Sequence, residues 1–302
     1  MKRIIWLASY PKSGNTWFRM LVANLRQDKP ADINDLPERE GICSARGRFD
    51  DIMLFPSGLL THEECDRLRP RVYEAIAREA GDEAEENETR IGDVRFVKTH
   101  DAWTYTSDGQ PLLGGSKGAD GAILIVRDPR DIAPSLAHHG RQSIDQSIDF
   151  MNDTDAHFCG QRDRQPKQLR QLMPRWDGHI ASWLDQTDIP IHLVRYEDMQ
   201  ADTAGVLRRA LAFAGIRVTL DEAVQATRFA DFGELRKQEA ERGFREAVTE
   251  QRGSGFFRRG ISGSWLDELS SAQVARIEGH HAAMMARLGY DTVIAPDERI
   301  AS

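Results

Sequence analysis

Cysteine is scarce in this chain of 302 residues. The three cysteines, Cys43, Cys65 and Cys159, are far apart, and none belongs to a Cys-x-x-Cys pair or to a cluster with metal-ligand spacing. A sparse and odd set of cysteines is typical of a reducing compartment. The sequence therefore predicts neither a disulfide framework nor a cysteine-held metal site.

Long apolar runs are also lacking. No stretch approaches the ~20 apolar residues that a membrane-spanning helix needs. The apolar segment near the N-terminus ends after about five residues in Ser-Tyr-Pro-Lys, which is shorter than the apolar region of a secretory signal. We therefore expect a soluble, cytoplasmic protein with no membrane partner.

The chain has no excess of positive charge. Its net charge of −8, from 40 Lys and Arg against 48 Asp and Glu, argues weakly against a nucleic acid or another polyanion as partner. The basic residues still suffice for a locally basic pocket. Apolar residues make up 40% of the chain, and we find no internal repeat or low-complexity linker. These features predict one domain over residues 1–302.

Short apolar segments alternate with longer helical patterns along the chain. Strands are predicted at residues 3–8, 95–99, 122–126 and 191–195. Helices are predicted at residues 15–27, 61–79, 131–138, 168–186, 203–214, 221–227 and 272–288. Continuously apolar strands between helices favour an α/β fold, with a central, mostly parallel sheet flanked by helices. Mobile loops around an acceptor site are predicted near residues 38–60, 101–120, 141–165 and 230–257.

The first predicted strand leads into a polar turn and then a helix. This arrangement presents backbone N–H groups to a phosphate, and the side chains of Lys12, Ser13, Asn15 and Thr16 add donors beside Gly14. The turn is not a Walker A loop, because its lysine precedes Ser-Gly and it has a single glycine. We expect it to hold a phosphate-like group without the usual Ser/Thr-bound magnesium.

The run Tyr-Pro-Lys-Ser-Gly-Asn-Thr-Trp that ends at Trp17 resembles the P-loop-like 5′-phosphosulfate loop of sulfotransferases that use 3′-phosphoadenosine 5′-phosphosulfate (PAPS). Asn15 stands where the family usually has Thr. The resemblance implies PAPS as donor, adenosine 3′,5′-bisphosphate (PAP) as product, and no metal.

Two further segments resemble the family's site for the 3′-phosphate. Arg127 and Ser135 fit its Arg-x-Pro-x-Asp-x-x-x-Ser pattern, which implies that they hold this group. Arg258, Arg259 and Gly260 stand where the family has Arg-Lys-Gly. A few residues later Ser264 replaces the family's Asp, which puts a local salt bridge or cap in doubt.

Weaker matches concern the adenine ring. Tyr196 lies in a Tyr-Glu-Asp segment that resembles the family's adenine side, and Thr227 and Phe229 resemble a short Thr-Ser-Phe segment. In the same scheme Trp17 would stack on the base. Each of these side chains could equally belong to the core.

A Lys-Thr-His sequence at residues 98–100 follows the second predicted strand. Sulfuryl transfer needs a base for the acceptor proton and cations near the departing phosphate, and imidazole and ammonium groups suit these tasks. The family carries the same three residues, which implies His100 as general base. It also implies that Lys98 assists at the transferring group and that Lys12 stabilises the leaving phosphate. We expect an in-line displacement with no covalent enzyme intermediate.

The sequence leaves alternatives open. A P-loop-type small-molecule kinase would need a Walker A lysine and a magnesium-binding Asp, and we find neither; a non-catalytic nucleotide-binding protein is the other alternative. The acceptor could be a phenol, an alcohol, an amine or a glycosylated natural product. Aromatic residues in the predicted loops suggest a partly apolar acceptor pocket; they are Phe49, Phe55, Trp103, Tyr105, Phe150 and Phe158. The oligomeric state is open, because the family's dimer motif does not match after Trp265.

Overall fold

The computed structural model describes residues 3–36, 42–79, 90–161, 166–247 and 255–293. Parts of the predicted loops at 38–60, 141–165 and 230–257 therefore lie outside the described residues. Within the described ranges, no helix is both long and apolar enough to cross a membrane.

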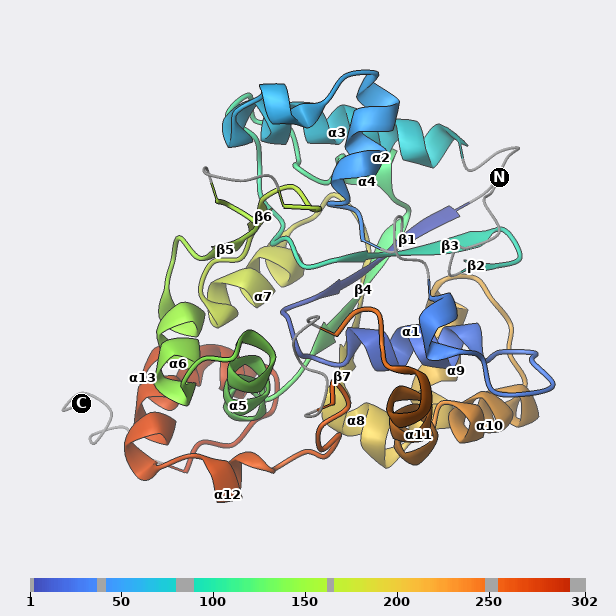
Figure 1. The fold of residues 1–302 in the computed structure, drawn as a ribbon, viewed down its shortest axis with the longest axis vertical. Coiled ribbons are helices and arrows are strands. Elements are labelled where there is room, and N and C mark those ends of the chain that lie inside the picture. The colour runs from blue at the N-terminus through green and yellow to red at the C-terminus, as the bar shows by residue number, and fades with distance from the viewer. Residues whose placement is uncertain (1–2, 37–41, 80–89, 162–165, 248–254, 294–302) are drawn as a thin grey trace.

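A five-stranded sheet forms the centre of the described part of the chain (Figure 1). Its order is β2-β3-β1-β4-β7, with bounds Arg90–Ile91, Val94–Thr99, Arg3–Ser9, Gly121–Val126 and Ile191–Arg195. All neighbouring strands pair in parallel except the short edge strand β2. The predicted mostly parallel sheet is confirmed, and each predicted strand is right to within one residue at either end.

Helices flank this sheet. The α-helices are α1 (Asn15–Ala23), α2 (Arg46–Met53), α3 (His62–Glu79), α4 (Gly115–Gly118), α5 (Pro129–Gly140), α6 (Ile144–Asn152), α7 (Trp176–Asp185), α8 (Tyr196–Ala201), α9 (Thr203–Phe213), α10 (Leu220–Phe229), α11 (Phe232–Arg242), α12 (Trp265–Glu268) and α13 (Ser271–Arg287). Two 3₁₀ turns, at Ile33–Asp35 and Ser57–Leu59, and a separate two-stranded sheet of β5 (His157–Phe158) and β6 (Gln171–Leu172) complete the fold.

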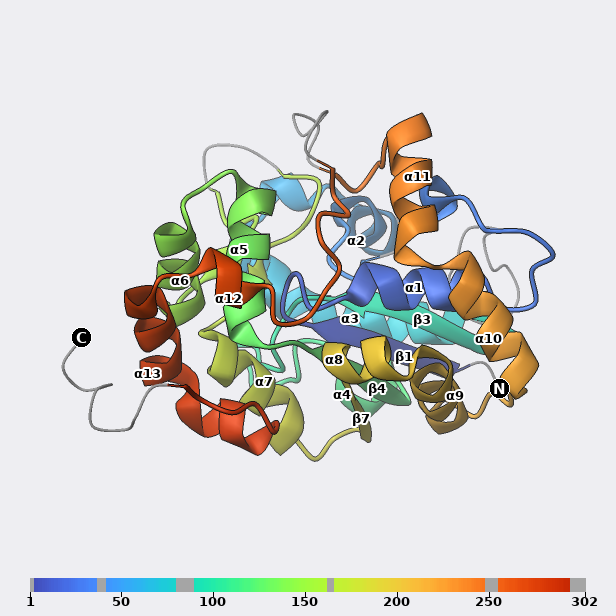
Figure 2. The ribbon, with the colours of Figure 1, turned by 90° about the horizontal axis from the view of Figure 1, so that it is seen from below.

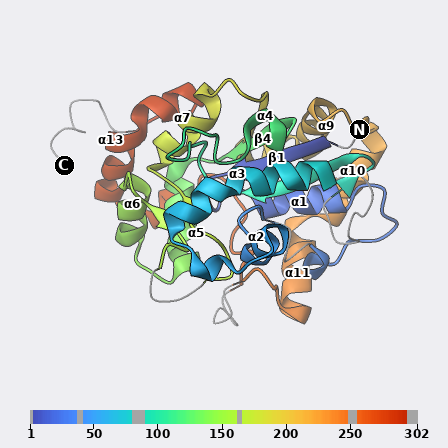
Figure 3. The same ribbon diagram turned by 90° about the horizontal axis from the view of Figure 1, so that it is seen from above.

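Alternate side chains of the central strands point to opposite faces, so two apolar clusters form. Trp6 packs on the face that also receives Tyr73 of α3 and Trp176 of α7. Leu7 packs on the other face, against Phe18 of α1 and helices α9 and α10. Figure 1 shows α3 on one side of the sheet and α1, α8, α9 and α10 on the other. The view from below gathers α5, α6, α12 and α13 at one end (Figure 2), and the view from above shows α2 beside α3 (Figure 3).

Four helices lie in stretches that were predicted to be loops, and there the secondary-structure prediction was wrong. These helices are α2, the short α4, α6 and α11. Helix α6 carries a capping box in which Ser143 and Gln146 bond each other's backbone N–H, a sequence signal that the loop prediction overlooked. Helix α11 begins after Asp231, whose side chain accepts from Gly233 N.

Two predicted helices were too long. The helix predicted at 168–186 begins only at Trp176, because Pro174 disfavours helical backbone before it. The helix predicted at 15–27 ends at Ala23, because the Asn24 side chain donates to Met20 O and accepts from Ala31 N. A capping box is present at the start of α3: Glu64 N donates to Thr61 Oγ1, and Thr61 N donates to Glu64 Oε2.

Candidate active site

The sheet brings the predicted motifs to a single edge. In the parallel register, Ala8 pairs with Thr99, Ser9 with Ile125, and Val126 with Arg195. The residues that follow these four strand ends therefore meet at the carboxyl edge of the sheet. A cavity of about 1060 Å³ opens there.

The cavity has two sides, set by the strand order. The loop side is formed by the loop at residues 11–17, of which all but Ser13 line the cavity, together with Arg127, Tyr196 and residues 258–260. The far side lies beyond β3, where Phe158 and parts of residues 42–51 and 166–171 form the wall. The lining residues of these two segments are Ile42, Ala45, Arg46, Gly47, Arg48, Asp50, Asp51, Pro166, Lys167, Gln168 and Gln171. Cys43 N donates to Lys98 O, and Leu169 N donates to Ser44 O, which fixes these two segments beside β3. Lys98 and His100 lie between the two sides.

The loop after β1 adopts left-handed backbone at Lys12 (φ 69°) and Gly14 (φ 102°). Lys12 pays a conformational cost there that glycine does not. At Gly14 a Cβ atom would lie 2.5 Å from Tyr196 Cδ2, so the Tyr196 ring packs directly on the loop. The loop then enters α1, and the first residues of this helix, Asn15, Thr16 and Trp17, line the cavity.

The side chains of this loop divide between structure and cavity. Asn15 Nδ2 donates inward, to Leu7 O at 2.9 Å and to Ser9 Oγ at 3.2 Å, so its amide group ties the loop to β1. Ser13 is buried, and its hydroxyl has no hydrogen-bond partner in the described part of the chain. Trp17 donates from Nε1 to Ala230 O and meets the Tyr196 ring edge-on at 5.6 Å.

Lys12 extends into the cavity and places Nζ 4.0 Å from the centre of the Phe256 ring. Burial lowers the pKa of the Lys12 ammonium to about 7, and the charges of Lys98, Arg127 and Arg258 contribute to the decrease. An anionic ligand would restore the ammonium charge. The group therefore suits the binding of a phosphate.

Arg127 connects the loop after β1 with residues 258–265, which we call the C-terminal segment. Its Nη1 donates to Lys12 O at 3.4 Å and its Nη2 to Ile261 O at 3.0 Å, while the guanidinium stacks over the Tyr196 ring at 4.3 Å. Nε is buried and without a hydrogen-bond partner among the described residues. The guanidinium thus keeps a donor available for a phosphate oxygen.

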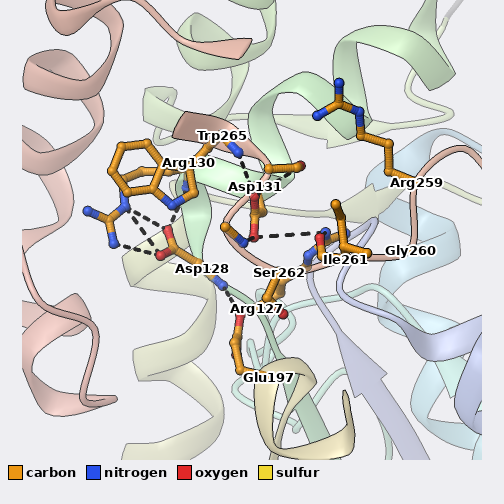
Figure 4. Close-up of polar contacts among 12 residues, drawn as sticks. Arg127, Asp128, Arg130, Asp131, Glu197, Arg259, Gly260, Ile261, Ser262 and Trp265 are labelled. Carbon is orange, nitrogen blue, oxygen red and sulfur yellow. Dashed lines mark hydrogen bonds and ion pairs between the residues drawn. The ribbon is translucent and has the colours of Figure 1, made fainter. Parts of the chain in front are cut away.

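Asp131, which lies on α5, holds the C-terminal segment against this helix (Figure 4). Its carboxylate accepts from Gly263 N at 2.7 Å, from Trp265 N at 3.0 Å and from Ser264 Oγ at 3.3 Å. Ser264, which replaces the family's Asp, is the N-cap residue of α12, but its hydroxyl makes no cap hydrogen bond and donates to Asp131 instead. Arg130 stacks 4.1 Å from the Trp265 ring on this segment.

The C-terminal segment lines the cavity with Arg258, Arg259 and Gly260. Arg258 is paired with Glu268, and Arg259, 41% exposed, lies 3.6 Å from the same carboxylate. Figure 4 shows Arg259 pointing away from Arg127. Ser135 of α5 also lines the cavity.

A hydrogen bond to the end of β1 orients the His100 ring. Its Nδ1 lies 2.8 Å from Ser9 O, and because a carbonyl only accepts, Nδ1 carries the proton. Nε2 therefore keeps its lone pair. Burial lowers the pKa of His100 well below its usual range, and the charge of Lys98 lowers it further. The neutral ring suits a general base.

A buried scaffold that the sequence analysis did not identify supports His100 from behind. Asp101 forms an ion pair with Arg69 at 2.5 Å, and both side chains are fully buried. Trp183 Nε1 donates to Asp101 O, and His179 Nε2 donates to His100 O at 3.0 Å. These contacts fix the backbone at the end of β3.

A second missed residue is Glu246, which lies inside the cavity. Its Oε1 is 2.5 Å from Arg19 Nη1, and its Oε2 is 3.6 Å from Lys98 Nζ and 3.5 Å from Thr16 Oγ1. No short motif could have indicated this, since Arg19 and Glu246 are 227 residues apart in sequence.

Not every predicted residue reaches the cavity. Thr227 and Phe229 are not among its lining residues, and the Thr227 hydroxyl donates to Ala223 O within α10. Of the six aromatic residues expected around the acceptor, only Phe158 lines the cavity. Phe49 and Trp103 are buried in the core, where apolar packing stabilises them. The other wall residues of the far side are largely polar; they include Arg48, Asp50, Asp51, Gln168 and Gln171.

The sequence profile of the sulfotransferase domain family matches residues 2–289, so the chain belongs to this family. Its members include curated relatives of known name. Luciferin sulfotransferase of Photinus pyralis is 22% identical over 282 residues, which cover 91% of this chain and 69% of the relative. Cytosolic sulfotransferase 17 of Arabidopsis thaliana is 27% identical over 289 residues, which cover 91% and 72%. Several alignments with other curated relatives span about half of their length or less, as with cytosolic sulfotransferase 16 of the same plant, at 48%.

Solved structures share the fold. Mouse sulfotransferase SULT7A1 complexed with PAP matches with a TM-score of 0.57 at 18% identity, over 95% of this chain and 85% of that one. Retinol dehydratase in complex with androsterone and inactive cofactor PAP matches with a TM-score of 0.58 at 19% identity, over 97% and 83%. The fold is therefore the sulfotransferase fold, with its P-loop-like strand, loop and helix.

Proposed function

We propose that the protein transfers a sulfuryl group from PAPS to a hydroxyl or amine of a small-molecule acceptor and releases PAP. The observation that carries this proposal is the meeting of Lys12, Lys98 and His100 in one cavity whose loop side also holds Arg127. Two groups on that side, Ser13 Oγ and Arg127 Nε, are buried donors without a partner among the described residues. Such donors suit a ligand rich in phosphate oxygens.

In the proposed reaction, His100 Nε2 takes the proton of the acceptor as the acceptor oxygen or nitrogen bonds to sulfur. The bond between sulfur and the 5′-phosphate oxygen breaks, and its electron pair leaves with PAP. Lys12 and Lys98 stabilise the charge that grows on the departing phosphate. Positioning and electrostatics supply the rate, as in phosphoryl transfer. The scheme needs no metal and no covalent enzyme intermediate.

For the donor, we propose that Arg127, Ser135, Arg258, Arg259 and the Gly260 N–H hold the 3′-phosphate. The loop residues Lys12, Ser13, Gly14 and Thr16, with the backbone of Asn15, hold the phosphosulfate. Trp17 and Tyr196 flank the adenine. Thr227 and Phe229 lie on α10 outside the lining of the cavity, and their contact with the adenine stays a prediction.

For the acceptor, we propose a molecule with several polar groups, bound on the far side. That side presents the amide groups of Gln168 and Gln171 and the charged groups of α2, with Phe158 as its one aromatic residue. Gln171 is buried, and its Oε1 has no hydrogen-bond partner in the described part of the chain. A hydroxyl-bearing alcohol or glycosylated compound matches this wall better than a flat apolar phenol. A cytoplasmic location remains a prediction, as does the absence of nucleic-acid partners.

The first test is calorimetric titration with PAP, ATP and AMP in the absence of magnesium. Selective binding of PAP, lost in Arg127→Ala and retained in Arg67→Ala, is the expected result; Arg67 lies on α3, outside the cavity lining. Equal or tighter binding of ATP would overturn the proposal in favour of a kinase. Radiolabelled PAPS with a panel of acceptors follows, and PAP binding without any turnover would identify a non-catalytic nucleotide-binding protein.

A further inference from the structure

Glu246 reaches the cavity from a turn that packing holds in place. The turn follows α11, and Arg245 N donates to Asn34 Oδ1 at 2.9 Å while Gly243 O accepts from Asn34 Nδ2 at 3.0 Å. Phe244 is buried against Phe256 at a ring distance of 4.9 Å. Contacts on both sides thus fix the backbone that carries the carboxylate.

The two carboxylate oxygens have different partners. Oε1 is 2.5 Å from Arg19 Nη1, and the Arg19 side chain is only 2% exposed. A buried guanidinium needs a counter-charge, so this oxygen is held in place. Oε2 is then directed toward Lys98 Nζ, at 3.6 Å, and toward Thr16 Oγ1, at 3.5 Å.

We propose that Glu246 is a positioning residue for sulfuryl transfer. Its carboxylate, anchored by Arg19, holds the Lys98 ammonium at the reacting end of the cavity and favours the charged form of that ammonium. The inference rests on the proposed role of Lys98. It also explains why a carboxylate lies in a cavity that we propose to bind a polyanionic donor, since its charge alone would oppose binding.

The charges around Lys98 support this role. Lys98 lies among Glu246, Arg19 of α1, Lys12 of the loop after β1, and His100. Burial lowers the pKa of the Lys98 ammonium and Arg19 lowers it further, while the Glu246 carboxylate raises it. Burial alone would raise the pKa of Glu246, but Lys98 and Arg19 hold it at about 2. Glu246 therefore stays ionised wherever the protein is folded near neutral pH, and it favours the charged form of Lys98.

The test is a direct titration of Lys98 by NMR on lysine-labelled protein, with the signal assigned from Lys98→Arg. In Glu246→Gln the pKa of Lys98 should fall by about one unit or more. Glu246→Asp should restore part of the shift. Glu241→Gln is the matched control, because Glu241 lies exposed on α11 outside the cavity lining, and it should leave the pKa unchanged.

An unchanged pKa of Lys98 in Glu246→Gln would overturn the inference. Tighter PAP binding by the same variant would also overturn it, because Glu246 would then only oppose the donor. If Glu246→Gln unfolds because Arg19 loses its counter-charge, the double variant Arg19→Met with Glu246→Gln removes both charges. The pKa of Lys98 should still fall in it, by less, since Arg19 no longer opposes the ammonium. The titration uses no donor, so a failure of the proposed function would appear separately, in the PAP calorimetry.

Discussion

On the loop side of the cavity, the lining residues come from short sequence runs that each follow a strand of the central sheet, apart from residues 258–260. On the far side, the wall combines α2, Phe158 and residues 166–171, which no motif connects. The loop side is dominated by cations and backbone N–H groups, and the far side by amides and mixed charges. In the proposed function, the donor is therefore bound by residues that the ends of the sheet strands place, whereas the acceptor is bound by connecting segments, which vary more readily than the sheet.

His100 lies at the boundary, and its removal should have the largest effect. His100→Ala should lower kcat by about 10²–10⁴-fold, because the acceptor proton then has no positioned base. The affinity for PAP should change by less than about twofold, since His100 is not among the residues that we propose to hold the donor. Steady-state kinetics with the acceptor found in the screen, together with calorimetry, measure the two quantities. A parallel loss of PAP affinity would place His100 on the loop side instead.

The next largest effect should come from Gly14→Ala. The new Cβ would meet the Tyr196 ring at 2.5 Å on left-handed backbone, which should lower the free energy of unfolding by about 1–3 kcal/mol. PAP binding should weaken by about tenfold or more, because the loop must shift. Thermal unfolding and calorimetry test this. Gly47→Ala is the matched control on the far side, where a Cβ meets nothing within 4 Å, and it should leave PAP affinity intact.

The pH dependence of PAP binding should show that Lys12, on the loop side, titrates near neutral pH. Because the pKa of Lys12 is lowered to about 7, the ammonium is charged below that pH and loses its proton above it. An anion binds the charged form, so PAP affinity should fall about fivefold between pH 7 and pH 8. Lys12→Arg keeps its charge over this range and should abolish the decrease. A decrease of the same size in Lys12→Arg would assign the titration to another group.

The smallest effect should come from the far side. Gln171→Leu should raise the KM for the sulfuryl acceptor by about threefold, because the buried Oε1 atom of Gln171 is lost from the wall. PAP affinity should not change. Gln27→Leu, on the exposed connection after α1, serves as the control. An equal effect on PAP affinity would show that the two sides are not independent.

The loop side was predictable from sequence because local residue order determines its geometry. Lys12, Gly14 and Thr16 occupy one turn, and the apolar strand before them fixes where that turn lies. His100 and Arg127 likewise follow recognisable strands. The register of the sheet then brings these three short runs together without further information.

The far side and the supporting residues could not be predicted, because their contacts join distant parts of the chain. Residue type alone does not distinguish an aromatic side chain in the core, such as Phe49 or Trp103, from one that lines a pocket. The Arg19–Glu246 and Arg69–Asp101 pairs likewise depend on tertiary packing. The Asn15 amide was expected to face a ligand, yet it bonds the strand behind it.

The contacts of Arg127 have a consequence for how the protein is made. This one guanidinium bonds Lys12 O, 115 residues earlier, and Ile261 O, 134 residues later. On a ribosome, the first loop of the chain emerges long before its C-terminal partner. The contacts of Arg127 therefore cannot be complete until Ile261 has been synthesised, although the last strand of the central sheet, β7, already ends at Arg195.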